Sequence, residues 1–304
     1  MTDLETGIAI GMLLAQKTGE TPDPEHDSDY WKWLTLSNPK KNQAVFLIRV
    51  TDATMKANLR VNPYSFPIIY ADAFSVDWGD GSNIETFSSS STPELVSHTY
   101  SHIGEYEVTF TNILGYNDYV ISASTSNFIM AKYGDNMCVH SVKSGGSTSS
   151  ANFKNYSMLR YVKLPPATEF NSSFFQSCSA LKTIEFDGII TTLYQGMFAY
   201  CRNLDFSSIK FGDIANIPQM CFAYCTTSLE TISLPACELI GNGAFLQCYN
   251  LKNASFPNCT TVEKSAFSDC YSLKSFTAAS NCTYGTDCFK RCYKLSPRPD
   301  GTQY

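Results

Sequence analysis

Cysteine is the residue of this 304-residue chain that offers the most chemistry, because twelve are present and a thiolate can act as nucleophile, disulfide partner or metal ligand. Six of them share one setting, three residues after a phenylalanine, and these phenylalanines recur every 22 to 24 residues. The six are Cys178, Cys201, Cys225, Cys248, Cys270 and Cys292. Such a period predicts an inward column of reduced cysteines acting as small buried apolar residues. Disulfides between neighbouring repeats stay open as an alternative, whereas no C-x-x-C pair or Cys/His cluster indicates a metal site.

Two aspartates form the other candidate site. Asp77 and Asp80 lie in the stretch D-W-G-D-G-S, and clustered carboxylates are the ligands that Ca²⁺ prefers. The alternative is that each carboxylate caps its own turn, for which Gly79 and Gly81 supply positive φ angles. The sequence therefore predicts a tight turn here, with calcium binding as the weaker alternative.

The other reactive side chains do not form a catalytic pattern. The four histidines stand apart from any nucleophile, His98 and His102 flank an expected strand rather than lie on a helix, and the carboxylates are scattered. The chain has no glycine-rich phosphate loop. We therefore expect a protein that is not an enzyme and needs no cofactor. A net charge of -6 without a Lys/Arg cluster also argues against nucleic acid as a partner.

The elements that position the cysteines belong to a repeat, F-x-x-C-x-x-L. Intact copies begin at Phe175, Phe198, Phe245, Phe267 and Phe289, while the copy at Phe222 has one extra residue and the copy at Phe153 has Tyr in place of Cys. Self-similarity at this period is typical of a solenoid, whose coils cannot bury their apolar faces alone. The segment between two copies reads L-x-x-I-x-L-P, a turn and a hydrophobic anchor. It predicts one short parallel strand per coil, with these strands forming a continuous sheet. The coil at 204–211 has two extra residues, so we expect a bulge there.

This consensus resembles the BspA-type leucine-rich repeat, most clearly in I-G-N-G-A-F-L-Q-C at 240–248 and V-E-K-S-A-F-S-D-C at 262–270. The resemblance covers about half of the chain. It implies a solenoid of the kind found on bacterial surfaces and in phage-encoded proteins, where such repeats are associated with adhesion and recognition.

The strand residues that point outward are the expected binding residues. They form two polar columns: Tyr161, Thr183, Ser208, Thr231, Asn253 and Ser275; and Lys163, Glu185, Lys210, Ser233, Ser255 and Thr277. Tyr249, Tyr271 and Tyr293, each directly after a column cysteine, are further candidates because tyrosine is a frequent binding anchor. The alternative is that these rings only cover the seam between coils. We select Tyr161, Lys163, Thr183, Glu185, Thr231, Asn253 and the three tyrosines as candidate binding residues.

Residues 43–124 show short β-type runs separated by turn clusters, which predict a β-sandwich. The motifs D-W-G-D-G-S, H-T-Y at 98–100 and G-E-Y-E-V at 104–108 resemble the PKD-like family of immunoglobulin-like sandwiches. One departure is that Trp78 directly precedes Gly79. The predicted fold is thus mainly β, with residues 1–42 as a docking peptide and linker, 43–124 as a PKD-like sandwich and 125–304 as the solenoid.

A short helix is predicted for residues 1–19, with Gly7, Gly11 and Ala15 along one face. This spacing lets helices approach closely. We expect it to dock onto a larger assembly or to support a homo-oligomer, the alternative being a frayed tail. Its apolar run is too short to span a bilayer and is preceded by acids, unlike a secretory signal. We therefore expect a virion or an extracellular or cell-surface location, with a phage tail or head fibre favoured over a secreted bacterial adhesin. The expected partner is a host-surface protein or glycan, and a purely structural virion protein is the competing interpretation.

Overall fold

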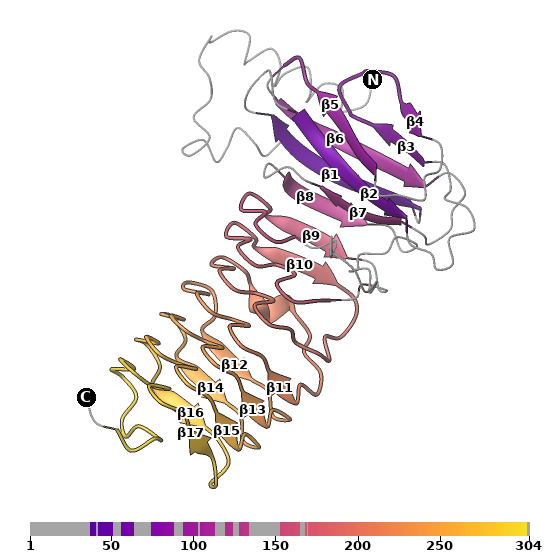
Figure 1. The fold of residues 1–304 in the computed structure, drawn as a ribbon. Coiled ribbons are helices and arrows are strands. Elements are labelled where there is room, and N and C mark those ends of the chain that lie inside the picture. Colours follow the sequence, from indigo (N-terminus) through magenta and orange to yellow (C-terminus); the bar gives the residue numbers. More distant parts are fainter. Residues whose placement is uncertain are drawn as a thin grey trace. The chain divides into compact units, whose positions relative to one another are not determined.

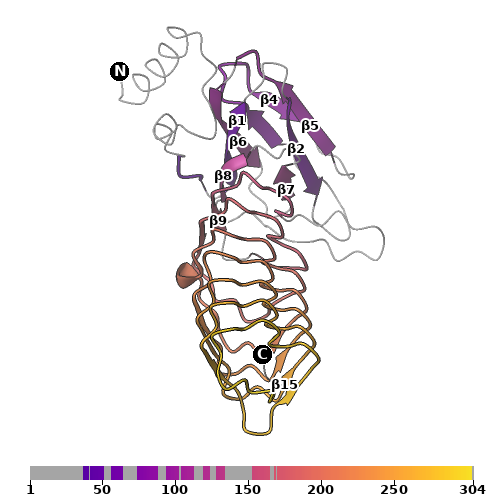
Figure 2. The same ribbon diagram turned by 90° about the vertical axis from the view of Figure 1, so that its left-hand side faces the viewer.

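The computed structural model describes most of the chain from residue 37 onward (Figures 1 and 2). The described residues are 37–40, 42–50, 56–63, 74–87, 94–102, 104–112, 119–123, 128–133, 153–164, 168 and 170–302. The helix predicted for residues 1–19, with Gly7, Gly11 and Ala15, and the acidic linker lie outside these residues.

The first half of the described chain consists of two antiparallel sheets. Its strands are β1 (Gln43–Val50), β2 (Lys56–Pro63), β3 (Phe74–Asp77), β4 (Glu85–Phe87), β5 (Glu94–Thr99), β6 (Gly104–Asn112), β7 (Tyr119–Ala123) and β8 (Phe128–Tyr133). One sheet contains the order β8-β1-β6-β3-β4 and the other the order β5-β2-β7. β1 is buried along almost its whole length, and it pairs with β6 along one edge and with β8 along the other. The mainly β fold class is confirmed.

One sheet continues from this part into the solenoid. β8 pairs with β1 in antiparallel fashion and, along its other edge, with β9 (Tyr161–Leu164) in parallel fashion. β9 in turn pairs with β10 (Thr183–Phe186), which gives the seven-stranded order β10-β9-β8-β1-β6-β3-β4. The domain boundary predicted between residues 124 and 125 falls directly before β8. That strand therefore covers the edge of the first solenoid strand, an edge that would otherwise be unpaired.

The later coils contribute two strands each. The first set follows the L-x-x-I-x-L segments and comprises β12 (Thr231–Ser233), β14 (Asn253–Ser255) and β16 (Ser275–Thr277). The second set lies at the hydrophobic anchors and comprises β11 (Asn216–Ile217), β13 (Leu239–Ile240), β15 (Thr261–Val262) and β17 (Thr283–Tyr284). Figure 2 shows the coils of residues 170–302 stacked on one another. The structure thus adds a second strand to the one that the repeat predicts.

The coil at 204–211 interrupts the first set of strands. Its extra length is taken up by a 3₁₀ turn of three residues, η1 (Phe206–Ser208), which Asp205 caps by accepting a hydrogen bond from the Ser207 amide. β10 and β12 consequently belong to different sheets. The single continuous sheet that we predicted is therefore wrong at this coil, because the inserted residues satisfy their backbone locally.

Phenylalanine and cysteine fill the core of the solenoid. The repeat phenylalanines stack with ring centroids 4.9 to 5.8 Å apart from Phe153 to Phe289. The six column cysteines are free and buried, as predicted. Each thiol donates a hydrogen bond of 2.9 to 3.2 Å to the carbonyl oxygen of the repeat phenylalanine one coil earlier. The cysteine is therefore a hydrogen-bonding residue as well as an apolar one.

Each of these coils also contains two residues in the left-handed region, with φ between 55° and 65°. One precedes the repeat phenylalanine by two residues, and the other directly precedes the column cysteine. They are Ser173, Gly196, Met220, Gly243, Ser265 and Asp287; and Ser177, Tyr200, Tyr224, Gln247, Asp269 and Arg291. Few of these are glycine, so their residue types do not reveal the turn. The repeating backbone imposes the conformation at a cost of about 1 kcal/mol or more per non-glycine residue.

Candidate functional site

The first two coils place four predicted binding residues side by side. Thr183 pairs with Tyr161 and Glu185 with Lys163 across the β9–β10 register. Lys163 Nζ lies 2.7 Å from Glu185 Oε1, and the Tyr161 hydroxyl donates to Glu185 Oε2. Burial and these interactions with Glu185 raise the pKa of Tyr161 above its usual value. Both oxygens of Glu185 are thus engaged within the protein, which joins the two coils and makes this carboxylate a poor candidate for ligand binding.

Ser208 and Lys210 do not join the polar columns. Ser208 lies in η1, where its hydroxyl donates to the carbonyl oxygen of Asp205 over 2.9 Å. The columns predicted through this coil are therefore wrong, because Ser208 is part of a local turn and Lys210, which follows the turn, lies in no strand.

The three strands of the first set form a regular polar face, which we call the hydroxyl grid. It consists of Thr231, Asn253 and Ser275 in one row and Ser233, Ser255 and Thr277 in the other, paired in register. All six side chains are exposed or half-buried, and Asn253 Nδ2 contacts Thr231 Oγ1 at 3.4 Å. A surface of this kind can hydrogen-bond a polar partner over a wide area.

Tyr249, Tyr271 and Tyr293 form a stacked column, which we call the tyrosine ladder. The ring centroids lie 5.0 Å apart at an interplanar angle of 3° for the first pair, and 5.8 Å apart at 20° for the second. Tyr271 is 37% exposed and Tyr293 is 58% exposed, while Tyr249 donates to Gln247 Oε1 over 2.6 Å. Stacking covers ring faces at the seam between coils and leaves ring edges open to solvent. A similar stack of Tyr200 on Tyr224, with centroids 4.2 Å apart, lies in the two coils directly before the ladder.

The Asp77 and Asp80 carboxylates cap their own turn. Asp77 Oδ1 accepts from the Gly79 amide at 2.9 Å, and Asp80 Oδ1 accepts from the Ser82 amide at 3.1 Å. Asp80 Oδ2 lies 2.6 Å from His98 Nε2. Partial burial alone would raise the pKa of Asp80, but the hydrogen bonds from Ser82 and His98 outweigh it and lower the pKa to about 2. The alternative of a capped turn accounts for both aspartates.

The surroundings of this turn explain its sequence. His98 stacks on Trp78, the Tyr100 hydroxyl donates to the Trp78 carbonyl oxygen, and Trp78 is fully buried. A side chain at Gly79 would place its Cβ 2.3 Å from the Glu107 carbonyl oxygen, so only glycine fits there. Throughout the part of the chain that the structure describes, no three His, Cys, Asp or Glu side chains are grouped so that they could hold a metal ion.

A family model described as "BspA type leucine rich repeat region" matches residues 140–205 and 168–296 in six copies, which together span just over half of the chain. The chain belongs to the BspA-type leucine-rich repeat family. Among curated proteins, none matches it. The described residues of this BspA-type protein include no helix long and apolar enough to cross a membrane.

Three solved leucine-rich repeat proteins resemble this BspA-type chain. A leucine-rich cell surface protein from Faecalibacterium prausnitzii is 20% identical with a TM-score of 0.44, and the match covers 59% of this chain and 49% of that one. The T. pallidum leucine-rich repeat protein is 19% identical with a TM-score of 0.34, over 45% and 78% of the two chains. A protein from Bacteroides ovatus is 14% identical with a TM-score of 0.22, over 58% and 77%. The chain thus spans about half the length of the Faecalibacterium protein, and no ligand or partner can be transferred at this similarity.

A second group of cysteines in the BspA-type coils is not part of the F-x-x-C-x-x-L repeat. Cys237, Cys259 and Cys282 lie at the turn between the two strands, with each thiol 3.3 to 3.6 Å from a carbonyl oxygen of its own coil. A hydrogen bond from Cys259 lowers the pKa of Cys237. The sequence does carry a signal for two of them. Cys237 and Cys259 each lie two residues after a proline, in L-P-A-C at 234–237 and F-P-N-C at 256–259.

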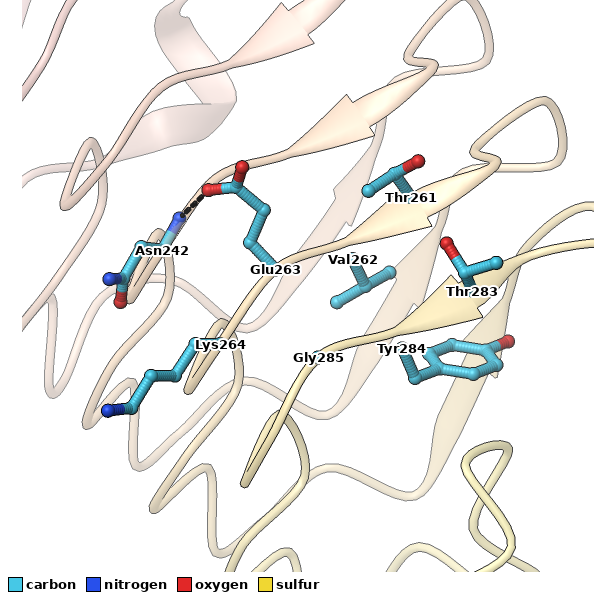
Figure 3. A pocket seen from close by; sticks show the side chains of 8 residues that line it. All are labelled: Asn242, Thr261, Val262, Glu263, Lys264, Thr283, Tyr284 and Gly285. Carbon is cyan, nitrogen blue, oxygen red and sulfur yellow. Dashed lines mark hydrogen bonds between the residues drawn. The ribbon is translucent and has the colours of Figure 1, made fainter.

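The second set of strands carries a shallow hollow of about 480 Å³ (Figure 3). Thr261, Glu263, Thr283 and Gly285 are among the residues that line it. Glu263 Oε2 accepts from the Asn242 amide at 2.8 Å, so the carboxylate is tied to the neighbouring coil (Figure 3). The hollow is open and holds no convergent set of polar groups, and it is therefore a weaker candidate than the tyrosine ladder and the hydroxyl grid.

Proposed function

We propose that this BspA-type protein is a non-enzymatic adhesion or receptor-recognition protein that binds a host-surface protein or glycan. The observation that carries the proposal is the regular alignment of Tyr249 and the exposed Tyr271 with the grid strands β14 and β16 of their own coils, with the exposed Tyr293 stacked on Tyr271. In the sequence, Tyr249 lies four residues before Asn253, and Tyr271 lies four residues before Ser275. A preorganised row of aromatic and polar side chains loses little conformational entropy on binding.

The cysteines support binding rather than catalysis. Burial raises the pKa of Cys248 to about 12 and also raises the pKa of Cys178 and Cys201. A thiol with a raised pKa stays protonated near neutral pH and is a poor nucleophile. The column cysteines therefore stabilise the scaffold that presents the binding face.

In this proposal the N-terminal sheets are a PKD-like spacer, and residues 1–19 dock onto a phage virion as part of a tail or head fibre. The pairing of β8 with both β1 and β9 supports a stiff connection between spacer and solenoid. Display in many copies would raise the weak affinity of one binding face to a useful avidity. A secreted bacterial surface adhesin would use the same binding face on a different carrier.

The experiment is a binding assay of the full-length protein on host cells and on a glycan array. Tyr271→Ala combined with Tyr293→Ala should weaken binding at least ten-fold. Lys182→Gln should leave it unchanged, because Lys182 is an exposed residue that lies several coils before Tyr271. Failure of the wild-type protein to bind any cell or glycan, together with co-purification with particles, would show a purely structural virion protein. Deletion of residues 1–19 should abolish incorporation into particles, and unchanged incorporation would contradict the docking role.

A further inference from the structure

We propose that the tyrosine ladder, together with the lysines beside it, is a binding site for an extended anionic polysaccharide that lies across the coils. This inference rests on the proposed function and narrows its ligand to one chemical class. The site is defined by Tyr249, Tyr271 and Tyr293 with Lys252, Lys274 and Lys294.

The aromatic rings of the ladder are oriented with their edges towards solvent. Because the ladder rings stack face to face at angles of 3° and 20°, the solvent meets ring edges and hydroxyl groups instead of ring faces. The edge of an aromatic ring carries partial positive charge, and the face carries partial negative charge. Exposed edges therefore favour oxygen-rich and negatively charged groups. A ligand that binds by covering ring faces would find the faces between the stacked rings already occupied.

The end of the solenoid that carries the ladder has an excess of basic residues. Residues 249–302 contain seven Lys and Arg against four Asp and Glu, whereas the whole chain has a net charge of -6. Two of these acids are neutralised by basic neighbours, since Arg291 Nε lies 2.7 Å from Asp269 Oδ1 and Lys290 Nζ lies 3.5 Å from Asp287 Oδ2. This end of the solenoid is therefore locally basic in an acidic protein, which favours an anionic partner.

Two lysines of the site are available for such a partner. Lys274 and Lys294 are exposed, and neither forms an ion pair with any residue that the structure describes. Lys252, by contrast, pairs with Glu230 at 2.8 Å. The motif Y-x-L-K at 249–252 recurs at 271–274, and its leucine is buried in both coils. Tyrosine and lysine thus flank a buried leucine at the same corner of successive coils.

The spacing of the tyrosine rings along the ladder suits a glycan chain. The tyrosine rings repeat every 5.0 to 5.8 Å, which is about the advance of an extended glycan chain by one sugar ring. A peptide strand laid along the same direction would present a residue on one face only every ~6.6 Å, and would lose register after two coils. Asn253 and Ser275, which directly follow Lys252 and Lys274, add donors and acceptors for sugar hydroxyls. The geometry therefore favours a glycan over an acidic peptide.

The test measures binding of the full-length protein to polygalacturonate, to neutral dextran and to poly-glutamate by titration calorimetry. We expect polygalacturonate to bind, with an affinity that falls as salt rises, and dextran and poly-glutamate to bind at least ten-fold more weakly. Tyr271→Ala with Tyr293→Ala should reduce the affinity ten-fold or more. Lys274→Gln with Lys294→Gln should reduce it and flatten the salt dependence. Lys182→Gln is the matched charge control, and unchanged thermal unfolding would verify that each variant is folded.

Equal affinity for poly-glutamate and polygalacturonate would overturn the inference in favour of an acidic protein partner. Polygalacturonate affinity unchanged in both double variants would overturn it as well. The two proposals can fail separately. Host-cell binding that persists in the double variants and is not competed by polygalacturonate would contradict only the polysaccharide site. The absence of any host-cell or glycan binding would contradict the recognition function itself.

Discussion

The Cys248 thiol donates a hydrogen bond of 3.1 Å to the carbonyl oxygen of Phe222, in the preceding coil. The same oxygen also accepts a hydrogen bond of 3.3 Å from the Cys225 amide of its own coil. One buried carbonyl thus receives a donor from each of two coils. This relationship recurs along the column and explains why the repeat keeps both phenylalanine and cysteine at a fixed spacing of three residues.

Replacing Cys248 with Ala should destabilise the solenoid by about 1–3 kcal/mol, because the buried Phe222 carbonyl loses a donor and the thiol leaves a small cavity. Cys248→Ser should cost less, since its hydroxyl can still donate. Cys282→Ala is the control, because this thiol is half-exposed and lies 3.6 Å from its acceptor. The measurement is urea unfolding, and equal losses for Cys248→Ala and Cys282→Ala would contradict the role of the bond.

Alkylation of the native protein should label Cys282 well before the column cysteines. Burial raises the pKa of Cys282 to about 11 and that of Cys248 to about 12, but only Cys282 is accessible to a reagent. Both therefore react slowly at pH 8, and Cys248 should react only after unfolding. Mass spectrometry under non-reducing conditions checks this order. Disulfide-linked peptides from the column would contradict the reduced core.

The turn that contains Asp80 should lose stability in acid. The pKa of Asp80 is lowered to about 2 in the folded protein, below its ordinary value of 3.8, so the ionised carboxylate favours folding. Its contribution is fully present above about pH 4 and is lost as the pH falls towards 2. Asp80→Asn should therefore have a lower melting temperature than wild type at pH 6, and the difference should shrink by pH 2. A difference independent of pH would contradict the ionic role.

Gly241→Ala should destabilise the protein by about 1–3 kcal/mol through overpacking. A Cβ at this position would lie 2.8 Å from the Gln219 amide nitrogen and 2.9 Å from the Ile217 carbonyl oxygen, which are backbone atoms that cannot move aside. Gly212→Ala is the matched control, since its nearest atoms are methyl groups of Ile189 and Thr191. Thermal unfolding should show the larger loss for Gly241→Ala.

Much of the scaffold can be predicted from the sequence because burial repeats with the coil. Phe175, Cys178 and Leu181 recur as a unit, and their apolar side chains can be buried only against the next copy, which specifies a solenoid. The first set of strands follows from the alternation in L-x-x-I-x-L. The turn at 77–82 likewise follows from its glycines and aspartates, whose conformational preferences are local.

The tertiary structure decides the features that depend on the spacing and rotation between coils. Glu185 is engaged because Lys163 and Tyr161 reach it from the coil before. η1 divides the predicted sheet because its three residues turn instead of extending. The left-handed backbone of Tyr200 and Tyr224 is imposed by stacked turns and not by residue type. The sequence by itself determined the solenoid and its core, through periodic burial. The structure decided which polar side chains pair with one another and which, like Lys274, stay exposed, because those contacts join residues a full coil apart.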